Sequence, residues 1–406
     1  MRTTTPIAAL AGLAVTLAAC GGGDAAADRV TATTGAPAAG TPIVAAVDEA
    51  DLQAVLDQWR DDVTAYGATL SIRVSGQDDV HLASGSDDRD PDTPMPTDGT
   101  FAAASITKTF VAAIALQLVA EGRLALDDTV EEWLPELPAA RETTLAMLLD
   151  HTAGLRNWEV DVLADLTRRY TGDEILAGSV AQPPHAPPGE RFVYTNANFT
   201  AAAVLIEREL GKGLDEIVAE RITGPLSLGD TLIGDGSVKP TRHGWFSLDT
   251  IPDPDRPLDN LDFPHEAVVT SGWGAGNLLT SSDDLLAWGE ALYSGELLGD
   301  DLTAEMRAMR RPFALTSSNG LLVETDQPTA LHYGLGTMGY CLDLAGCSPD
   351  DVEVVGHSGS VPGSRSLVAH HVESGTTIVV HANVGDIDLP ELAAILPDIL
   401  ASLGLT

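Results

Sequence analysis

The sequence predicts an α+β fold in which strands from both ends of the chain share one sheet and a mostly helical lobe lies between them. Strand-like runs stand at 69–74 and 80–83 near the N-terminus, and further runs return between 352 and 381. Helical periodicity dominates the stretch from 106 to about 220. Strands and helices that are grouped along the chain, rather than alternating, are typical of the α+β class.

A helix is expected on either side of these strands. In 49–66, five apolar residues recur at helical spacing and form one face, which a helix buries against a neighbouring element. These residues are Leu52, Val55, Leu56, Trp59 and Val63. A closing helix is expected at about 389–403, after the last strand-like run.

The N-terminal segment resembles the signal of a bacterial lipoprotein. A short positively charged start is followed by an apolar stretch, 6–19, that is too short to serve as a stable membrane span. Small residues then precede Cys20, as in a lipobox, so 1–20 is expected to be a lipoprotein signal peptide with Cys20 as the lipidated residue. An ordinary secretory signal cut near residue 19 would also export the protein. We expect an exported, cell-surface lipoprotein that meets the bacterial membrane only through this lipid anchor.

The rest of the chain divides into a flexible tether and one large domain. Residues 21–48 are rich in Thr, Ala, Gly and Pro and are expected to form a flexible tether. Residues 49–406 are long for a single core and suit two lobes that share a site.

The formal net charge of −38 argues against a nucleic-acid partner. Acidic clusters lack the spacing of a calcium loop, so no metal or cofactor is expected.

Two of the three cysteines remain after Cys20 is assigned to lipidation. Cys341 and Cys347 lie six residues apart in a protein that is expected to be exported. This spacing in an oxidising compartment predicts a disulfide rather than a metal pair.

The first chemical motif is Ser105 followed three residues later by Lys108, at the start of an apolar helical run. On a helix these two side chains share a face. A serine hydroxyl needs a neighbouring base, and a buried lysine has a lowered pKa that suits this role. The helix N-terminus offers free N–H groups where an oxyanion forms. The competing interpretation is a capping serine and a solvated lysine, but apolar residues on all sides of Lys108 favour burial.

Two further motifs carry polar groups that suit the same chemistry. Tyr194 and Asn196 stand just before a predicted helix at 198–210, where a phenol can move protons and an amide can hold a carbonyl. A core tyrosine and a capping asparagine are the alternative.

The third motif follows a strand-like run and consists of His357, Ser358, Gly359 and Ser360. If this segment is an edge strand beside the serine, the Ser360 N–H would be a second oxyanion donor. A glycine-rich hairpin connection is the alternative there.

In this order and at these separations, the three motifs resemble the serine β-lactamase and penicillin-binding protein superfamily. The chain is similar to the branch with class C β-lactamases, and closest to its D-alanyl-D-alanine carboxypeptidases and related esterases. Segments 148–155, 272–281 and 333–336 also match landmarks of this branch, so the resemblance covers roughly 50–404. It implies an antiparallel sheet flanked by helices plus a mostly helical lobe, with the serine at the junction of the lobes.

The resemblance also implies the roles of the site residues. Ser105, Lys108 and Tyr194 are expected to be catalytic, with Ser105 forming a covalent acyl-enzyme and the amides of Ser105 and Ser360 holding the oxyanion. Asn196, His357, Ser358, Gly359 and Ser360 are expected to bind substrate, with His357 and Ser358 facing a substrate carboxylate. The sequence leaves open whether Lys108 or Tyr194 is the base.

The substrate is the least determined point. His-Ser-Gly in place of Lys-Thr-Gly favours a D-alanyl-D-alanine carboxypeptidase acting on peptidoglycan stem peptides, without a cofactor and as a monomer. An esterase, a β-lactamase, and a surface lipoprotein that binds β-lactams or muropeptides without turnover are the alternatives. Arg365 is the one cation suggested for a substrate carboxylate, and His151 is expected to hold a loop rather than to react.

Overall fold

A computed structural model describes most of the predicted domain. The described residues are 47–90, 92–158, 160–246, 258–262, 264–315, 321–384 and 387–405. The predicted signal peptide, Cys20 and all but the last two residues of the tether lie outside them. Among the described residues, no helix is both long enough and apolar enough to cross a membrane.

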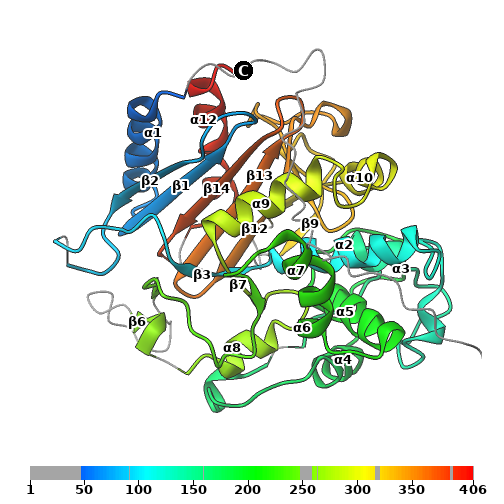
Figure 1. The fold of residues 1–406 in the computed structure, drawn as a ribbon. Coiled ribbons are helices and arrows are strands. Elements are labelled where there is room, and N and C mark those ends of the chain that lie inside the picture. The colour runs from blue at the N-terminus through cyan, green and yellow to red at the C-terminus, as the bar shows by residue number, and fades with distance from the viewer. Residues whose placement is uncertain are drawn as a thin grey trace, which may run out of the picture. The chain divides into compact units, whose positions relative to one another are not determined.

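One antiparallel sheet of nine strands joins the two ends of the domain (Figure 1). In spatial order its strands are β2 (Val80–Gly85), β1 (Gly67–Arg73), β14 (Thr376–Ala382), β13 (Ser364–His371), β12 (Val354–Val361), β11 (Met338–Tyr340), β10 (Leu331–Tyr333), β8 (Arg311–Leu315) and β9 (Leu322–Glu324). The first strand of the domain pairs directly with the last, with Leu70 opposite Val380. The predicted α+β class, with both chain ends in one antiparallel sheet, is confirmed.

The two faces of this sheet bury different cores because successive side chains of a strand point to opposite sides. On β13, Leu367 and Ala369 join one apolar cluster, whereas Val368 between them joins the other. On β14, Val379 likewise points away from its two neighbours. Both faces are therefore covered, and the strands read as continuous apolar runs.

Helices from the two chain ends cover the first face of the sheet. α1 (Glu49–Asp62) and α12 (Leu396–Ser402) pack on each other there, together with α11 (Leu389–Ala393). α1 begins at the predicted place, capped by the Asp48 side chain. It ends four residues before the predicted boundary, just ahead of Thr64, whose left-handed φ of 56° a helix cannot contain. The single closing helix expected at 389–403 is two short helices instead.

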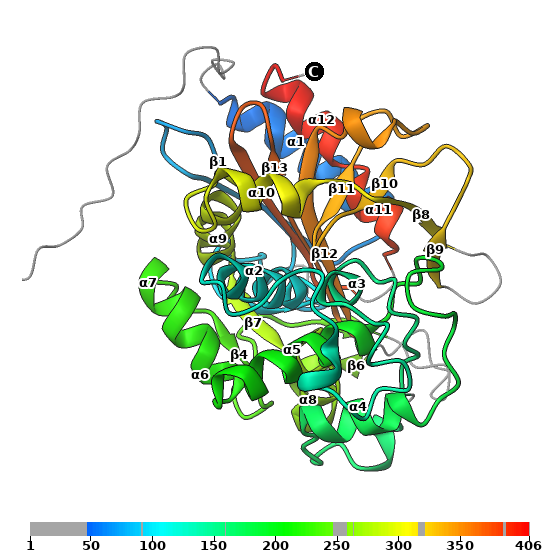
Figure 2. The ribbon, with the colours of Figure 1, turned by 90° about the vertical axis from the view of Figure 1, so that its right-hand side faces the viewer.

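The second face of the sheet meets the helical lobe. α9 (Ser282–Tyr293) lies across β13 and β14, and α2 (Thr107–Ala120) lies between the sheet and α5 (Asn196–Leu210) (Figure 2). The other helices are α3 (Leu145–Leu149), α4 (Gly172–Val180), α6 (Leu214–Val218), α7 (Gly224–Leu226), α8 (Glu266–Ser271) and α10 (Asp300–Arg307). Smaller sheets consist of β3 (Thr100–Ala104), β7 (Leu278–Ser281) and β4 (Leu232–Ile233), and of β5 (Trp245–Phe246) and β6 (Leu258–Asp259). The lobe is mostly helical, as predicted.

A disulfide between Cys341 and Cys347 closes a short loop after β11. Reducing it is expected to lower the free energy of unfolding by about 2 kcal/mol, because an open loop gives the unfolded chain more conformations. Urea unfolding with and without reductant measures this loss. The double variant Cys341→Ser/Cys347→Ser is the control, since its stability must not respond to reductant. Equal stability of the wild type in both conditions would contradict the prediction.

Candidate active site

Ser105 lies at the turn between a strand and a helix. β3 ends at Ala104 and α2 begins at Thr107, so the serine stands at the N-terminal end of the helix. Ala104 has a left-handed φ of 48°, which an alanine adopts only when its surroundings hold it there. The Thr107 hydroxyl donates to the Ala104 carbonyl at 2.6 Å. This tight turn presents the serine hydroxyl toward a cleft.

Lys108 is fully buried one turn after the serine. Its Nζ lies 2.8 Å from Ser105 Oγ, 2.9 Å from Asn196 Oδ1 and 2.7 Å from the Ala275 carbonyl oxygen. Burial lowers the pKa of the Lys108 amine well below its usual value. No carboxylate forms a salt bridge with this amine among the described residues. The surroundings therefore favour the neutral form.

The three partners of Lys108 define what a neutral amine would do. Asn196 Oδ1 and the Ala275 carbonyl can only accept hydrogen bonds. A neutral amine satisfies both with its two N–H groups, and its lone pair then faces the Ser105 hydroxyl. In this arrangement the serine O–H donates to Lys108, which is the geometry of a nucleophile beside its base.

Tyr194 and Asn196 come to the same point from the start of α5. The backbone N–H of Tyr194 donates to the Leu322 carbonyl at 3.0 Å, which fixes the extended segment before the helix. The Tyr194 ring lies 4.9 Å from Lys108 Nζ. Burial raises the pKa of the Tyr194 phenol above its usual value, although a hydrogen bond with Ser105 opposes this shift. Tyr194 is therefore a neutral phenol beside the serine.

The third motif lies in β12, which is not an edge strand of the sheet as a whole, because it pairs with both β13 and β11. The pairing with β11 covers only 354–356, so among the described strands residues 357–361 pair with β13 alone and the motif lies on an unpaired edge, as expected. Gly359 lies so close to β3 that a Cβ there would stand 2.0 Å from the Ala103 carbonyl oxygen. This close approach brings Ser360 to the cleft opposite Ser105.

His357 does not occupy the place expected for it. Its side chain is completely buried, and its two ring nitrogens contact the Tyr333 hydroxyl at 3.1 Å and the Ser358 carbonyl at 2.7 Å. Neither nitrogen is therefore free to face a substrate carboxylate. Ser358 is half-buried, and its hydroxyl lies 3.6 Å from the sulfur of Met338. Of the His-Ser-Gly-Ser segment, only Ser360 lines the cleft.

A buried chain of hydrogen bonds runs behind the cleft from His151 through Tyr333 to His357. The backbone N–H of Thr195 donates to His151 Nδ1 at 3.3 Å, so His151 carries its proton on Nε2 and donates to the Tyr333 hydroxyl at 3.1 Å. Tyr333 then donates to His357 Nε2, and His357 Nδ1–H donates to the Ser358 carbonyl. Burial is the main cause that lowers the pKa of both histidines, that of His357 to about 3. The chain is therefore neutral and ties α5 to β12.

Replacing Tyr333 by phenylalanine is expected to cost about 1–3 kcal/mol of stability, because two buried imidazole nitrogens lose their shared partner. Activity is expected to fall as well, since α5 and β12 lose their link. Urea unfolding and ester hydrolysis measure the two effects. Tyr293→Phe is the matched control, because this buried tyrosine hydroxyl bonds Thr337 Oγ1 at 2.8 Å and does not join two imidazoles. A loss no larger than that of the control would argue against the chain.

The cleft in front of Ser105 has a volume of about 290 Å³. It is lined by Ala104, Ser105, Asn157, Trp158, Val160, Ile175, Ser179, Asn196, Ala197, Val268, Ser271, Gly272, Ala275, Gly276, Ser360, Val361 and Pro362. Asn157 was not foreseen; its Oδ1 accepts from the Ala197 N–H at 3.0 Å. Ala275 was also missed as a partner of Lys108, although it lies within the family-like segment 272–281. A backbone acceptor leaves no signal in side-chain chemistry.

The cleft offers little positive charge to a substrate. Among the described residues that line it, none is arginine or lysine. Arg365, the suggested cation, lies opposite Ser360 on β13. Its Nε donates to the Ile387 carbonyl at 2.7 Å, and its Nη1 donates to the Val361 carbonyl at 2.9 Å. Arg365 thus braces the end of β12.

Comparisons with known proteins agree with this architecture. A family model described as Beta-lactamase matches residues 52–394. Esterase EstB from Burkholderia gladioli is 31% identical over 60% of this chain and 69% of its own length. Penicillin-binding protein 4* from Bacillus subtilis is 24% identical over 78% of this chain and 68% of its own.

Solved structures show the same fold. The D-amino acid amidase from Ochrobactrum anthropi SV3 superposes with a TM-score of 0.74 at 23% identity, over 88% of this chain and 98% of that chain. A D-stereospecific amidohydrolase from Streptomyces sp. has a TM-score of 0.70 at 26% identity, over 87% and 98%. Because the family model spans most of the chain and the fold agrees, this protein belongs to the Beta-lactamase family and is a serine hydrolase of the β-lactamase and penicillin-binding protein fold.

Proposed function

We propose that this protein hydrolyses neutral esters and D-amino-acid amides through an acyl-enzyme on Ser105. The observation that carries the proposal is the Lys108 amine, which lies 2.8 Å from the Ser105 hydroxyl with its two other partners both obligate acceptors. Relatives named as an esterase and as D-aminopeptidases support the substrate class.

The proposed reaction begins with attack of Ser105 Oγ on a carbonyl carbon, while its proton passes to the Lys108 amine. The N–H groups of Ser105 and Ser360 hold the oxyanion. The Tyr194 phenol gives its proton to the leaving group and is reprotonated from Lys108. Water then hydrolyses the acyl-enzyme by the reverse proton path. The lowered pKa of Lys108 favours a neutral amine that can accept the serine proton, and the raised pKa of Tyr194 keeps its phenol protonated; these states support Lys108 as the base and Tyr194 as the proton donor.

A D-alanyl-D-alanine carboxypeptidase is the second candidate. It is supported by the likeness to penicillin-binding protein 4* and by the position of Arg365 opposite Ser360. A peptide carboxylate needs a cation, and the backbone carbonyls of Ile387, Val361 and Ser364 compete for the donors of Arg365. We therefore rank substrates without a carboxylate first. A β-lactamase, or a binding protein without turnover, would use the same serine. The experiment below distinguishes both from the proposed hydrolase.

The deciding experiment compares the domain 46–406 with its Ser105→Ala variant. Each protein receives p-nitrophenyl acetate, D-phenylalanine amide, a D-Ala-D-Ala peptide and a penicillin, and product release and intact mass are followed. Serine-dependent release from the ester or the amide supports the proposal. Release of D-alanine alone would favour the carboxypeptidase, and rapid penicillin turnover alone would favour a β-lactamase. A stable adduct without any product would favour a binding protein.

We also propose that the protein is exported and anchored through a lipid on Cys20. The apolar stretch before this cysteine supports the proposal. Expression of the full chain in a bacterium with a labelled fatty acid tests it, with Cys20→Ala as the control. Label on the wild type alone, in the membrane fraction, is expected. Unlabelled wild-type protein would refute the lipid anchor.

A further inference from the structure

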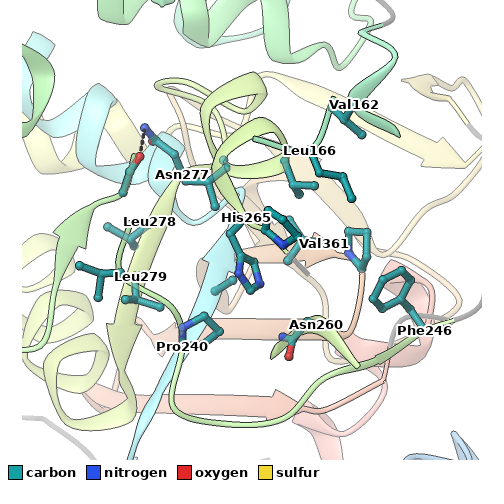
Figure 3. Close-up of a pocket in the computed structure, with 18 residues that line it drawn as sticks. Val162, Leu166, Pro240, Phe246, Asn260, His265, Asn277, Leu278, Leu279 and Val361 are labelled. Atoms are coloured by element: carbon teal, nitrogen blue, oxygen red, sulfur yellow. Dashed lines mark hydrogen bonds between the residues drawn. The ribbon is translucent and has the colours of Figure 1, made fainter. Parts of the chain in front are cut away.

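A second cavity of about 230 Å³ adjoins the catalytic cleft. The two cavities share four lining residues: Val268, Gly276, Val361 and Pro362. Val361 directly follows Ser360 on β12, so this cavity begins one residue from the proposed oxyanion donor. Figure 3 shows its labelled side chains around the space, contributed by segments far apart in the sequence.

The surface of this cavity, which we call the apolar chamber, consists mainly of hydrocarbon. Leu166, Val269 and Leu279 line it, and no aspartate, glutamate, lysine or arginine is among its described lining residues. Three polar side chains also border it, but Asn260 Oδ1, His265 Nδ1 and Asn277 Oδ1 have almost no exposed surface. A cavity of about 150 Å³ with such walls already binds benzene. The chamber is therefore large enough for a phenyl ring or a chain of about six carbons.

The position of the chamber decides which part of a substrate enters it. The leaving group must contact the proton donor. The Tyr194 ring centroid lies 6.3 Å from that of His357, whereas the chamber begins at Val361, four residues further along β12. The chamber instead borders β3 and β7, through Ala102, Leu278 and Leu279. The group that remains on the serine is thus the group that faces the chamber.

We propose that the apolar chamber binds the acyl side of the substrate and selects acyl groups with an apolar chain or ring of about six carbons. This inference rests on the proposed acyl-enzyme function and names its substrate class. Each methylene that is buried is expected to raise kcat/KM about fourfold until the chamber is full. Acyl groups longer than the chamber gain nothing further.

The test uses p-nitrophenyl esters of acetate, butyrate, hexanoate, phenylacetate and decanoate, so that only the acyl part changes. For the wild type, kcat/KM is expected to rise at least tenfold from acetate to hexanoate, to be high for phenylacetate, and to rise no further for decanoate. Val269→Asp places a charge in the chamber and is expected to reduce the hexanoate-to-acetate ratio at least tenfold. Val268→Phe, which narrows the junction with the cleft, is a second variant should the first fail to fold. Val372→Asp, at an exposed valine outside both cavities, is the control and leaves the ratio unchanged.

A binding measurement separates this proposal from the proposed function. The Ser105→Ala protein is titrated calorimetrically with acetamide, hexanamide and phenylacetamide, which are uncharged and need no turnover. Tighter binding of hexanamide and phenylacetamide than of acetamide, lost in Ser105→Ala/Val269→Asp, supports the chamber even if no ester is hydrolysed. Serine-dependent hydrolysis with equal kcat/KM for acetate and hexanoate would overturn the chamber and leave the hydrolase standing. Equal binding of the three amides would overturn it as well.

Discussion

Replacing Lys108 by methionine is expected to lower kcat/KM for ester hydrolysis by about 10²- to 10⁴-fold, the range that a positioned general base contributes. Methionine keeps the unbranched apolar part of the side chain but has no amine. Ser105 then loses the lone pair that accepts its proton, and the Tyr194 phenol cannot replace it because burial raises its pKa. Initial rates on p-nitrophenyl acetate measure the loss.

The pH dependence of the wild type is the sharper readout of the same prediction. Only the neutral amine can accept the serine proton, so activity rises with pH as Lys108 loses its own proton. Because burial lowers the Lys108 pKa, this rise is expected well below pH 10.5, the usual value for lysine. The folded protein also binds fewer protons than the unfolded chain up to pH 10.5, so Lys108 makes the free energy of unfolding rise with pH across this window.

Two controls separate the role of Lys108 from a general effect of losing a lysine. Lys212→Met removes a half-exposed lysine that pairs with Glu216 and Glu220 on the surface, and it is expected to leave both rate and pH profile unchanged. Lys108→Arg keeps a positive charge that stays protonated, so it is expected to be as inactive as Lys108→Met. An arginine variant with wild-type activity would mean that charge alone is needed and that Lys108 is not the base.

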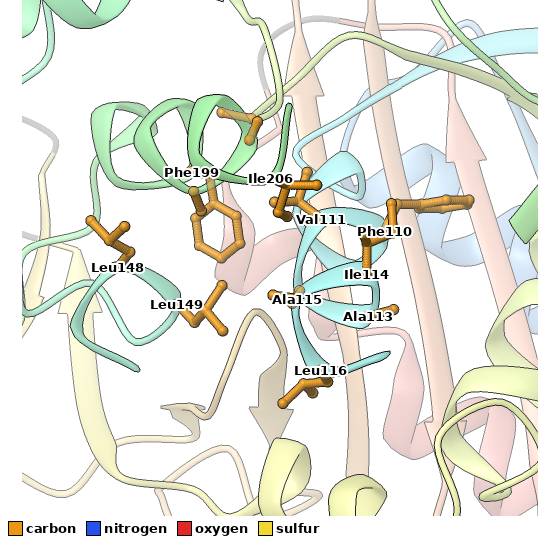
Figure 4. Close-up of a cluster of buried hydrophobic side chains, with 14 of the residues drawn as sticks. Phe110, Val111, Ala113, Ile114, Ala115, Leu116, Leu148, Leu149, Phe199 and Ile206 are labelled. Atoms are coloured by element: carbon orange, nitrogen blue, oxygen red, sulfur yellow. The ribbon is translucent and has the colours of Figure 1, made fainter. Parts of the chain in front are cut away.

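Apolar patterning made the position of Lys108 predictable. The residues around it are apolar on all sides, a pattern that is typical of a buried helix. Figure 4 shows apolar side chains on more than one side of α2: Phe110 points away from Phe199 of α5, and its ring stacks on Trp288 with the centroids 3.9 Å apart. The spacing of residues along the chain was therefore sufficient to predict the helix, the burial of Lys108 and the position of Ser105 beside it.

The parts that could not be predicted depend on contacts between distant segments. His357 was expected to face the substrate because the family resemblance places the His-Ser-Gly triplet there, and its sequence neighbours do not reveal a partner behind the strand. Its partner Tyr333 lies on β10, two strands away, and His151 comes from the other lobe. The placement of β12 inside the sheet similarly depends on β11, a strand of three residues that is too short to be found by periodicity.

Replacing Gly359 by alanine is expected to lower kcat/KM at least about 100-fold and to cost about 1–3 kcal/mol of stability. The new methyl group would stand 2.0 Å from the Ala103 carbonyl oxygen and 2.6 Å from Ser366 Oγ. Both neighbours are held in place, since the Ser366 hydroxyl itself donates to Ala103 at 3.2 Å. β12 must therefore move away from β3. This movement takes the Ser360 N–H away from Ser105, beside which it is proposed to hold the oxyanion.

The Gly359→Ala prediction concerns geometry rather than chemistry, because no reacting group is removed. Gly229→Ala is the matched control: a Cβ there has no neighbour within 4 Å, and its backbone does not need glycine. Hydrolysis rates and urea unfolding of both variants measure the effect. If Gly359→Ala folds and keeps wild-type kcat/KM, then the distance between β12 and β3 does not matter for the reaction, and Ser360 cannot be an oxyanion donor. A large loss of rate in a folded variant would instead tie catalysis to the close approach of these two strands.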